Sequence, residues 1–449
     1  MHYDAIIIGC GSGGYEAAIQ CANLGGKTAV VESDDFGGTC VNRGCIPSKV
    51  WQKAASIWES FSESETFGIK VSEKTINYKK VVERKNNVSR DIRMGMEGML
   101  AGSGVDIIKG KGVITEPGRV KVDNAVYEAR NVIIATGSSL FIPEIPGLDD
   151  ALYTSDRILD MEHPPKSVLI YGGGYVEAEM ACLLNTFGVR VILAAKSKRI
   201  LEMEDHDTSQ RLVQALKDKQ IKVITNASFD SVKKAGDGYK CVFNGHEEDA
   251  HLVEKILICS RKPNVSGLGL KSLGIELNDD GGIKVNDFLE TSVKGIFAVG
   301  DATGGWMLSH AASSMAAVAA KNAMGGQSKY PFRLIPRGVF TTPEIGAVGL
   351  SEEEAEKMGY DVEIGSFPYS INGLAMCRNE LDGAVKIVAD ATYGEILGVH
   401  IVGSQATELI NEAVVAMLLE ATVQEFAGSV TVHPTFSETL VQAARGVDI

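Results

Sequence analysis

The 449-residue sequence predicts a multidomain α/β protein in which two glycine-rich strand–turn–helix units precede a C-terminal α+β domain. The first observation is the apolar run 3–8, which leads into a G-x-G-x-x-G turn at Gly9, Gly11 and Gly14. The second is a similar apolar run, 168–171, that also ends in glycines. The third is chain length, since a chain of this size exceeds one compact core and about three domains are expected.

The first glycine-rich unit has the parts of a dinucleotide-binding motif. A helix is expected from the glycine turn to about Leu24, and a second strand, 27–31, ends at Glu32. A glycine fingerprint alone is a weak signal, but two strands, a helix and an acid about 20 residues on make the motif specific. We therefore expect the helix N-terminus to bind a pyrophosphate and Glu32 to bind the ribose hydroxyls.

The second glycine-rich unit departs from the motif in two places. Glu177 replaces the third small residue, where it adds bulk and negative charge beside the pyrophosphate and is expected to push the helix from the strand. The following strand, 190–193, reaches Ala195, where the acid of an NAD site is missing. Lys196 favours a 2′-phosphate, whereas Glu202 opposes one, so NAD and NADP both stay open, with NAD preferred.

Two cysteines, Cys40 and Cys45, stand five residues apart in a small-residue stretch, 37–49. On an ideal helix they would lie about 140° and about 7.5 Å apart, too far for a bridge whose Cα atoms are roughly 4.4–6.8 Å apart. The stretch must therefore bend, with Gly44 and the glycines before Cys40 supplying the freedom, before a helix that continues through 51–61. We interpret the pair as a redox-active disulfide. Two free thiols or half a metal site are the alternatives, and no second ligand pair follows.

Composition narrows the class of partner. The formal net charge of −14 argues against nucleic acid or an anionic membrane as the main partner. No apolar run approaches the roughly 20 residues of a membrane span, and the N-terminal run is interpreted as a strand, not a signal peptide. We expect a cytoplasmic location, in which a disulfide is usually catalytic.

The stretch 37–49 resembles the disulfide motif of the pyridine-nucleotide:disulfide oxidoreductases, flavoproteins that include dihydrolipoamide dehydrogenase and glutathione reductase. The resemblance runs through the whole chain. It is carried further by Ala135-Thr136-Gly137, by a strand ending in Gly300-Asp301, by the segment 305–311 and by the His-Pro-Thr-x-Ser-Glu run 433–438. It implies that the first unit holds FAD, that the second holds NAD(P), and that the C-terminal α+β domain is a dimerisation domain.

The resemblance also implies site residues. The implied catalytic residues are Cys40, Cys45, Lys49, Glu179, His433 and Glu438. The implied FAD-binding residues are Gly9, Gly11, Gly14, Glu32, Gly38, Thr39, Lys49, Thr136, Gly137, Asp301, Met307, Leu308 and His310. The implied NAD(P)-binding residues are Gly172, Gly174, Glu177 and Lys196.

The family assigns each catalytic residue a role. Cys40 would exchange with substrate and Cys45 would pass electrons to the flavin. His433, its ring held by Glu438, would be the acid/base, and both would come from the partner subunit. Lys49 would lie near the flavin and pair with Glu179, and Asp301 would hydrogen-bond the ribityl chain.

The expected domains are interleaved along the chain, with breaks at the prolines near 143–146 and 331–336. They are an FAD-binding domain with the disulfide (1–145), an NAD(P)-binding domain (146–265), a second part of the FAD domain (266–335) and an interface domain (336–449). In the last, we expect antiparallel strands at 384–388 and 396–402, and a helix within 405–420 whose apolar face serves dimerisation or core packing.

The expected function is oxidation of protein-bound dihydrolipoamide through the Cys40–Cys45 disulfide and FAD, with hydride transfer to NAD+, in a homodimer that serves a lipoyl-carrying protein. A glutathione-reductase-like NAD(P)H disulfide reductase is an alternative, suggested by Val41, Tyr175 and Lys196. A mercuric reductase lacks support because the chain has no terminal cysteine pair.

A flavoprotein redox subunit or sensor with impaired nicotinamide use is a further alternative. It is suggested by Glu177 and by Ser260, where the family has glycine before the arginine. No metal site is expected, because the histidines do not cluster. His246 and His251 flank an acidic run, 247–249, that we interpret as a solvated turn.

Overall fold

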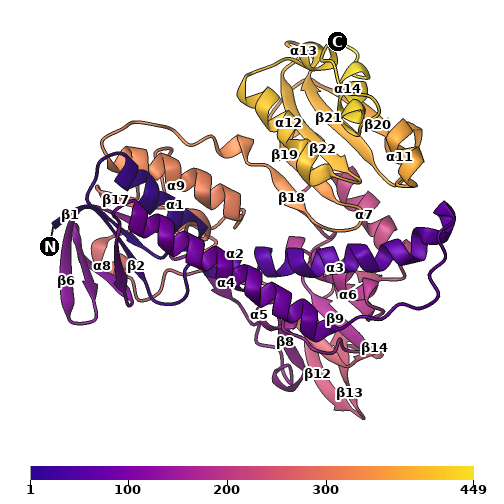
Figure 1. The fold of residues 1–449 in the computed structure, drawn as a ribbon, viewed down its shortest axis with the longest axis horizontal. Coiled ribbons are helices and arrows are strands. Elements are labelled where there is room, and N and C mark those ends of the chain that lie inside the picture. The colour runs from indigo at the N-terminus through magenta and orange to yellow at the C-terminus, as the bar shows by residue number, and fades with distance from the viewer. Residues whose placement is uncertain (1) are drawn as a thin grey trace. The chain divides into compact units, whose positions relative to one another are not determined.

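The computed structural model describes residues 2–449, without the side chains of residues 247–249 (Figure 1). The chain folds into two compact units. The one that carries both cysteines, called here the disulfide unit, contains the residues up to Pro143, Thr154–His163 and Ser260–Tyr330. The other, called the histidine unit because it carries His433, contains Glu144–Tyr153, Pro164–Cys259 and Pro331–Ile449. The domain boundaries expected after residues 145, 265 and 335 stay predictions.

The disulfide unit is built on a seven-stranded sheet in the order β3-β2-β1-β6-β5-β4, with β17 also paired to β6. Its strands are β1 (His2–Ile8), β2 (Thr28–Glu32), β3 (Asp106–Lys109), β4 (Gly112–Glu116), β5 (Arg119–Val122), β6 (Ala125–Ile134) and β17 (Ile296–Ala298). β1 runs parallel to β2 and to β6, so that Ile8 lies opposite both Val31 and Ile134. The carboxyl ends of these strands meet at one edge, where ligands of such sheets bind.

Helices pack around this sheet. Two of them begin close to each other, because their first residues, Ser12 and Ser309, are in contact. They are α1 (Ser12–Asn23), α2 (Gly38–Asn42), α3 (Cys45–Glu63), η1 (Ser64–Phe67), α4 (Tyr78–Gly102), α5 (Ser155–Ile158), α8 (Leu270–Leu273), η3 (Gly300–Thr303) and α9 (Ser309–Ala323). α1 packs on α9 (Figure 1), and a Cβ on Gly13 would lie 3.2 Å from the carbonyl oxygen of Ala312. A short antiparallel ribbon joins β7 (Ser138–Leu140) to β16 (Arg261–Pro263).

The histidine unit begins with a second parallel sheet in the order β11-β10-β9-β15-β8. Its elements are η2 (Asp149–Ala151), β8 (Leu152–Thr154), β9 (Ser167–Tyr171), α6 (Tyr175–Thr186), β10 (Arg190–Ala194), α7 (His206–Asp218), β11 (Lys222–Ile224) and β15 (Lys255–Ile258). The strand–turn–helix–strand order of β9, α6 and β10 confirms the second dinucleotide-type fold. The apolar strands lie in the core, with Val168, Leu169 and Ile170 fully buried.

A three-stranded antiparallel sheet of β12 (Phe229–Ala235), β13 (Gly238–Phe243) and β14 (His246–Val253) follows β11. The solvated turn expected between His246 and His251 is wrong, because both residues belong to β14. The side chains of its acidic run lie outside the described residues. The turn falls instead at Asn244 and Gly245, whose φ angles of 52° and 74° suit the tight hairpin turns that an Asn-Gly pair favours.

The C-terminal part of the histidine unit is an antiparallel sheet in the order β18-β19-β22-β21-β20, which confirms the predicted α+β domain. Its strands are β18 (Arg337–Val339), β19 (Ile345–Gly349), β20 (Val362–Pro368), β21 (Ala384–Asp390) and β22 (Ile396–Val402). Its helices are η4 (Phe332–Leu334), α10 (Glu352–Lys357), η5 (Tyr369–Ile371), α11 (Gly373–Arg378), α12 (Ala406–Leu418), α13 (Val423–Ala427) and α14 (Ser437–Arg445).

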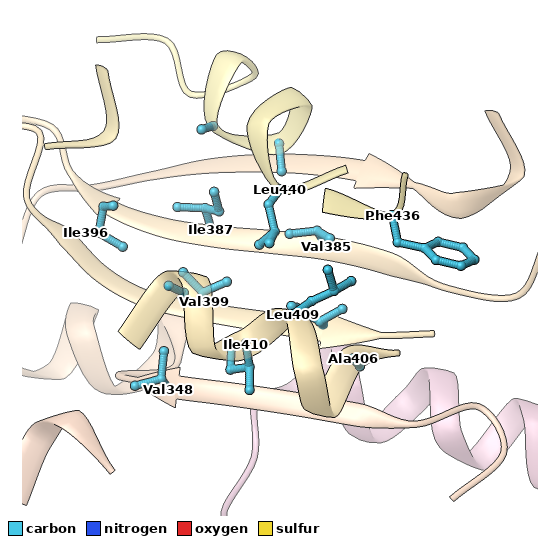
Figure 2. Packing of buried hydrophobic residues seen from close by; sticks show 14 of the residues in the cluster. Val348, Val385, Ile387, Ile396, Val399, Ala406, Leu409, Ile410, Phe436 and Leu440 are labelled. Carbon is cyan, nitrogen blue, oxygen red and sulfur yellow. The ribbon is translucent and has the colours of Figure 1, made fainter. Parts of the chain in front are cut away.

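The core of this domain lies between the sheet and the helices α12 and α14. Figure 2 shows Ile410 of α12 and Leu440 of α14 reaching the apolar side chains of the strands. β21 and β22 are buried along their whole length, because the opposite face of β22 packs on α7. The antiparallel strands expected at 384–388 and 396–402 are therefore present and are covered on both faces.

None of the helices among residues 2–449 combines the length and the apolar character that crossing a membrane requires.

Candidate active site

The first glycine turn of the disulfide unit forms a cradle that only glycine allows. Gly9 has a φ of 98°, and a Cβ there would lie 2.4 Å from the carbonyl oxygen of Ala135. A Cβ on Gly14 would lie 1.8 Å from the carbonyl oxygen of Gly9. Gly11 is the N-cap of α1, and within residues 2–449 no side chain caps this helix. The amides of the first turn therefore point into a space suited to a phosphate group.

Glu32 stands at the end of β2 beside this cradle. Its carboxylate accepts the backbone N–H of Cys10 at 2.7 Å, and its other oxygen accepts those of Ser33 and Asp34 at 2.7 and 2.8 Å. These three bonds fix the carboxylate at the edge of the sheet. An acid at this place is the feature that dinucleotide sites use for the ribose, and this role of Glu32 stays a prediction.

The cysteine stretch bends as its spacing predicts. Gly37 and Gly38 have φ angles of 86° and 55° and open the short helix α2, which carries Cys40. The helix breaks at Gly44, and α3 begins at Cys45. A Cβ on Gly38 would lie 2.9 Å from the Cα of Gly11, so the start of α2 is pressed against the glycine cradle. Both cysteines are thiols in this structure, Cys40 partly buried and Cys45 exposed.

Polar neighbours favour a thiolate at Cys40. The Cys45 thiol donates to the Cys40 sulfur, and together with the Ser309 and Ser12 hydroxyls and the charge of Lys49 it overcomes the opposing effect of burial and lowers the pKa of Cys40 to about 6. The two serine hydroxyl oxygens lie 2.5 Å apart. A thiolate is the form of cysteine that attacks a disulfide, so Cys40 is prepared for exchange.

Sequence reasoning missed both serines. Each is the first residue of a helix, Ser12 of α1 and Ser309 of α9. A serine at the start of a helix is usually taken as a capping residue, and nothing local indicates that these two would meet across 297 residues. The signal that was available was their position inside two stretches that are both expected to bind the flavin.

A second polar cluster surrounds Asp301, in η3. The Ser138 hydroxyl donates to the Asp301 carboxylate at 2.6 Å and accepts from Nε of Arg261 at 2.9 Å. Arg261 also donates to the Thr39 hydroxyl at 3.1 Å and to Asp156 at 3.2 Å. The guanidinium thus holds both the polar cluster around Asp301 and the helix that carries Cys40. Sequence reasoning noticed only the residue before this arginine.

The remaining residues expected around the flavin lie at the same edge of the sheet. The Thr136 hydroxyl donates to the carbonyl oxygen of Asn264 at 2.7 Å, and the backbone N–H of Asn264 donates to the carbonyl oxygen of Gly137 at 2.9 Å. Met307, Leu308 and His310 surround the N-terminus of α9, where Leu308 is the N-cap. The structure thus gathers the expected residues in one unit, while their individual roles stay predictions.

The second glycine turn, in the histidine unit, is filled by its own glutamate. Burial raises the pKa of Glu177, and the carboxylate accepts hydrogen bonds from the backbone N–H groups of Gly174 and of Glu177 itself. A Cβ on Gly172 would lie 2.7 Å from one carboxylate oxygen, and a Cβ on Gly174 would lie 2.9 Å from the other. Ala195 is buried beyond the end of β10, and Lys196 is exposed. The expected acid is absent, as the sequence predicted.

Hydrogen bonds to buried residues hold the first turn of α6 in place. The Tyr175 hydroxyl donates to the Glu204 carboxylate, which also accepts from Nε of Arg337 at 2.9 Å. Glu204 and Arg337 are both buried. Four residues after Tyr175, Glu179 accepts the backbone N–H of Phe340 at 3.1 Å. The predicted pairing of Glu179 with Lys49 stays a prediction.

His433 and Glu438 lie together at the C-terminal end of the histidine unit. Nδ1 of His433 is 2.9 Å from a carboxylate oxygen of Glu438, whose other oxygen accepts the backbone N–H of Thr435 at 2.9 Å. The Thr435 N–H first, and then His433, lower the pKa of Glu438. The side chain of His433 is 78% exposed, so its ring is held but open on one side.

Among the side chains that the structure describes, which leave out those of residues 247–249, no group of three or more His, Cys, Asp or Glu residues is arranged to hold a metal ion. The reactive groups of the structure are thus thiols, an oriented imidazole and two glycine cradles. A fold with two dinucleotide-type sheets and a thiolate-forming cysteine pair defines a nucleotide-dependent disulfide oxidoreductase.

Comparison with known proteins identifies the family. The model of the pyridine nucleotide-disulphide oxidoreductases matches residues 3–316, and that of the dimerisation domain of the same family matches residues 335–444. The chain belongs to this family and is an FAD-dependent disulfide oxidoreductase. It is 37% identical to a dihydrolipoyl dehydrogenase of Bacillus subtilis, over 99% of this chain and 98% of that one, and 37% identical to that of Thermus scotoductus, over 99% and 97%.

Solved structures agree with this fold. LpdA from Mycobacterium tuberculosis is 28% identical, with a TM-score of 0.90 over 98% of this chain and 99% of that one. The flavoprotein disulfide reductase RclA from Escherichia coli is 25% identical, with a TM-score of 0.87 over 99% of both chains. Proteins of this family use FAD and NAD(P).

The two cradles differ in how they fit these cofactors. In the disulfide unit, the uncapped amides after Gly11, the fixed carboxylate of Glu32 and the carboxylate of Asp301 fit FAD and would hold it. In the histidine unit, the glycine turn contains the Glu177 carboxylate. This conformation does not fit a second dinucleotide pyrophosphate, because two anions would share one set of amides.

Proposed function

We propose that this chain oxidises the dihydrolipoyl group of a carrier protein, through Cys40, Cys45 and FAD, with NAD+ as the final acceptor. The observation that carries the proposal is the set of donors that hold Cys40 as a thiolate beside the cradle that fits FAD. The whole-length similarity to dihydrolipoyl dehydrogenases supports this choice of substrate.

The dithiol step needs three groups of this chain. The substrate loses two protons and two electrons as the Cys40–Cys45 disulfide becomes a dithiol, so that one disulfide replaces another. His433 takes a proton from the substrate thiol, because a carboxylate that accepts from Nδ1 leaves Nε2 free to act as base. Cys40 is the exchanging sulfur, and Cys45 would pass the electrons to the flavin. When bound, FAD accepts the electron pair from the protein dithiol.

We propose that the active form is a homodimer in which His433 serves the partner's disulfide. The family's dimerisation domain supports this, and so do apolar side chains just before His433 that are left in the open, Val430 at 98% and Val432 at 76% exposure. Exposed apolar residues so close to a proposed catalytic histidine favour a second copy as the surface that covers them. Subunit exchange tests this, since His433→Ala and Cys45→Ser are each expected to be inactive alone and to regain part of the activity when mixed. Mixed dimers without any activity would contradict it.

The expected roles of the FAD-binding residues, the domain boundaries and a cytoplasmic location belong to the same proposal. A steady-state assay tests it. Purified protein is expected to reduce NAD+ with dihydrolipoamide faster than it reduces oxidised glutathione with NADH or NADPH. Preference for oxidised glutathione would favour the second candidate, a disulfide reductase, which Lys196 and the absence of an acid at Ala195 support.

A further inference from the structure

The registers of the two parallel sheets make the two cradles directly comparable. Ile8 lies opposite Val31 in the first, and Tyr171 lies opposite Ala194 in the second. Counting from these pairs, Gly9 corresponds to Gly172, Gly14 to Glu177, and Glu32 to Ala195. The first cradle has a glycine where the second has an acid, and an acid at its edge where the second has an alanine.

The Glu177 carboxylate lies where the glycines leave room for a ligand. Its two oxygens are within 2.7 and 2.9 Å of the positions that Cβ atoms on Gly172 and Gly174 would take. It accepts the backbone N–H of Gly174, which is the N-cap of α6. In a dinucleotide site, the glycines exist so that a pyrophosphate can approach this backbone. The protein's own carboxylate occupies the position of the ligand's anion.

Glu177 is the third residue of α6 and accepts the N–H of the N-cap residue, as the glutamate of a capping box does, but its surroundings differ from those of the capping boxes in this unit. Glu354 and Glu425 cap α10 and α13, and each forms a capping box with a serine or threonine N-cap. Glu354 is exposed, whereas Glu177 is 6% exposed and has a glycine as N-cap. Burying a carboxylate costs free energy that only its hydrogen bonds to the amides offset. Backbone N–H groups therefore hold the Glu177 carboxylate in the way that they would hold a bound anion.

The helix start has little freedom to open the cradle by moving. Tyr175, the first residue of α6, is bonded to Glu204, and Glu204 is paired with Arg337 inside the core. A shift of the first turn would break this buried cluster. Rotation of the Glu177 side chain out of the turn is the motion that leaves the cluster intact.

We propose that Glu177 is an internal competitor for the pyrophosphate of the nicotinamide dinucleotide, and that the second cradle accepts the cofactor only when this side chain leaves it. The proposal rests on the proposed function in one respect, the assignment of NAD(P) to the histidine unit. Because the apparent affinity is reduced by the fraction of open cradles, an open state populated at about 0.1–10% weakens binding about 10- to 1,000-fold.

Calorimetry with ADP-ribose on the FAD-loaded protein tests this, because ADP-ribose carries the pyrophosphate and no nicotinamide. Glu177→Gly is expected to lower the Kd for ADP-ribose at least about tenfold, the lower end of that range. Adenosine, which has no pyrophosphate, should bind wild type and variant equally. Glu177→Gln, which removes the charge and keeps the bulk, should give a smaller gain. Glu354→Gln is the matched control, since it alters a capping glutamate of the same unit, and should bind ADP-ribose as wild type does.

Glu177→Ala covers the case in which glycine destabilises α6, because alanine has the higher helix propensity. An unchanged or higher Kd for ADP-ribose in both folded variants would overturn the proposal. An equal gain for adenosine would also overturn it, because the effect would then not arise at the pyrophosphate. Reduction of the flavin by a dithiol without nucleotide measures the proposed function separately and should be the same in wild type and variants.

Discussion

The acidity of Cys40 leads to a quantitative prediction for Cys45→Ala. The Cys45 thiol is the largest contributor to the low pKa of Cys40, and its loss leaves two serines and Lys49 against burial. We expect the pKa of Cys40 to rise from about 6 by at least about one unit, toward the ordinary value of about 8.5.

The rate at neutral pH is a poor measure of this change. Full restoration of the ordinary pKa would reduce the thiolate fraction at pH 7 from about 90% to about 3%. A less acidic thiolate is, however, the stronger nucleophile, by about tenfold for this difference. The two effects nearly cancel, so the rate at pH 7 would fall only about threefold. The midpoint of the profile of rate against pH reports the pKa of Cys40 directly, because a change in nucleophilicity alters the height of the plateau and not the midpoint.

The assay is alkylation of the reduced protein by iodoacetamide from pH 5 to 10, with Cys40 followed by peptide mass spectrometry. Wild type should show a midpoint near 6, above which Cys40 reacts, since thiolate forms as the pH rises through the pKa. Cys377→Ser is the control, because this exposed cysteine lies elsewhere and its removal should not move the midpoint. A midpoint that stays near 6 in Cys45→Ala would refute the assignment of the low pKa to the Cys45 hydrogen bond.

Three further predictions follow from single contacts. Arg261→Lys keeps the charge but not the fork that reaches two hydroxyls, so FAD retention after dialysis should fall about tenfold or more, and unchanged flavin content would contradict the bracing role. Glu438→Gln should lower kcat/KM for dihydrolipoamide at least about tenfold, whereas Glu425→Gln, which removes an exposed capping carboxylate, should stay within about twofold. Leu440→Ala should cost about 2–5 kcal/mol of unfolding free energy in urea, and a loss below about 0.5 kcal/mol would show that the core of Figure 2 repacks around it.

Patterns local in sequence predicted the secondary structure around the site. The first cradle follows from apolar strands and a glycine turn in which Gly9 has a φ of 98°, an angle that only glycine adopts readily. The bend between Cys40 and Cys45 follows from disulfide geometry, and the structure has it at Gly44. The antiparallel C-terminal strands follow from their composition, although the complete burial of β22 depends on α7, which packs on it from far away in the sequence.

Local sequence patterns could not predict contacts between residues that lie far apart in the sequence. Arg261 reaches Thr39 across 222 residues, and Ser12 meets Ser309 across 297. Glu177 was recognised as foreign to its motif, but the expected result was steric separation of helix from strand. The structure shows the carboxylate bonded to the turn itself, because a flexible side chain can satisfy the backbone amides there. Separation of the helix from the strand stays a prediction.

The measurement that tests the account most directly is anaerobic reduction of the bound flavin by dihydrolipoamide, without any nicotinamide, in wild type and in Cys45→Ser. Wild type is expected to lose its oxidised flavin absorbance within seconds, and Cys45→Ser to stay yellow and folded because its flavin site is untouched. Flavin reduction in Cys45→Ser at the wild-type rate would contradict the claim that electrons pass from the substrate through this cysteine pair.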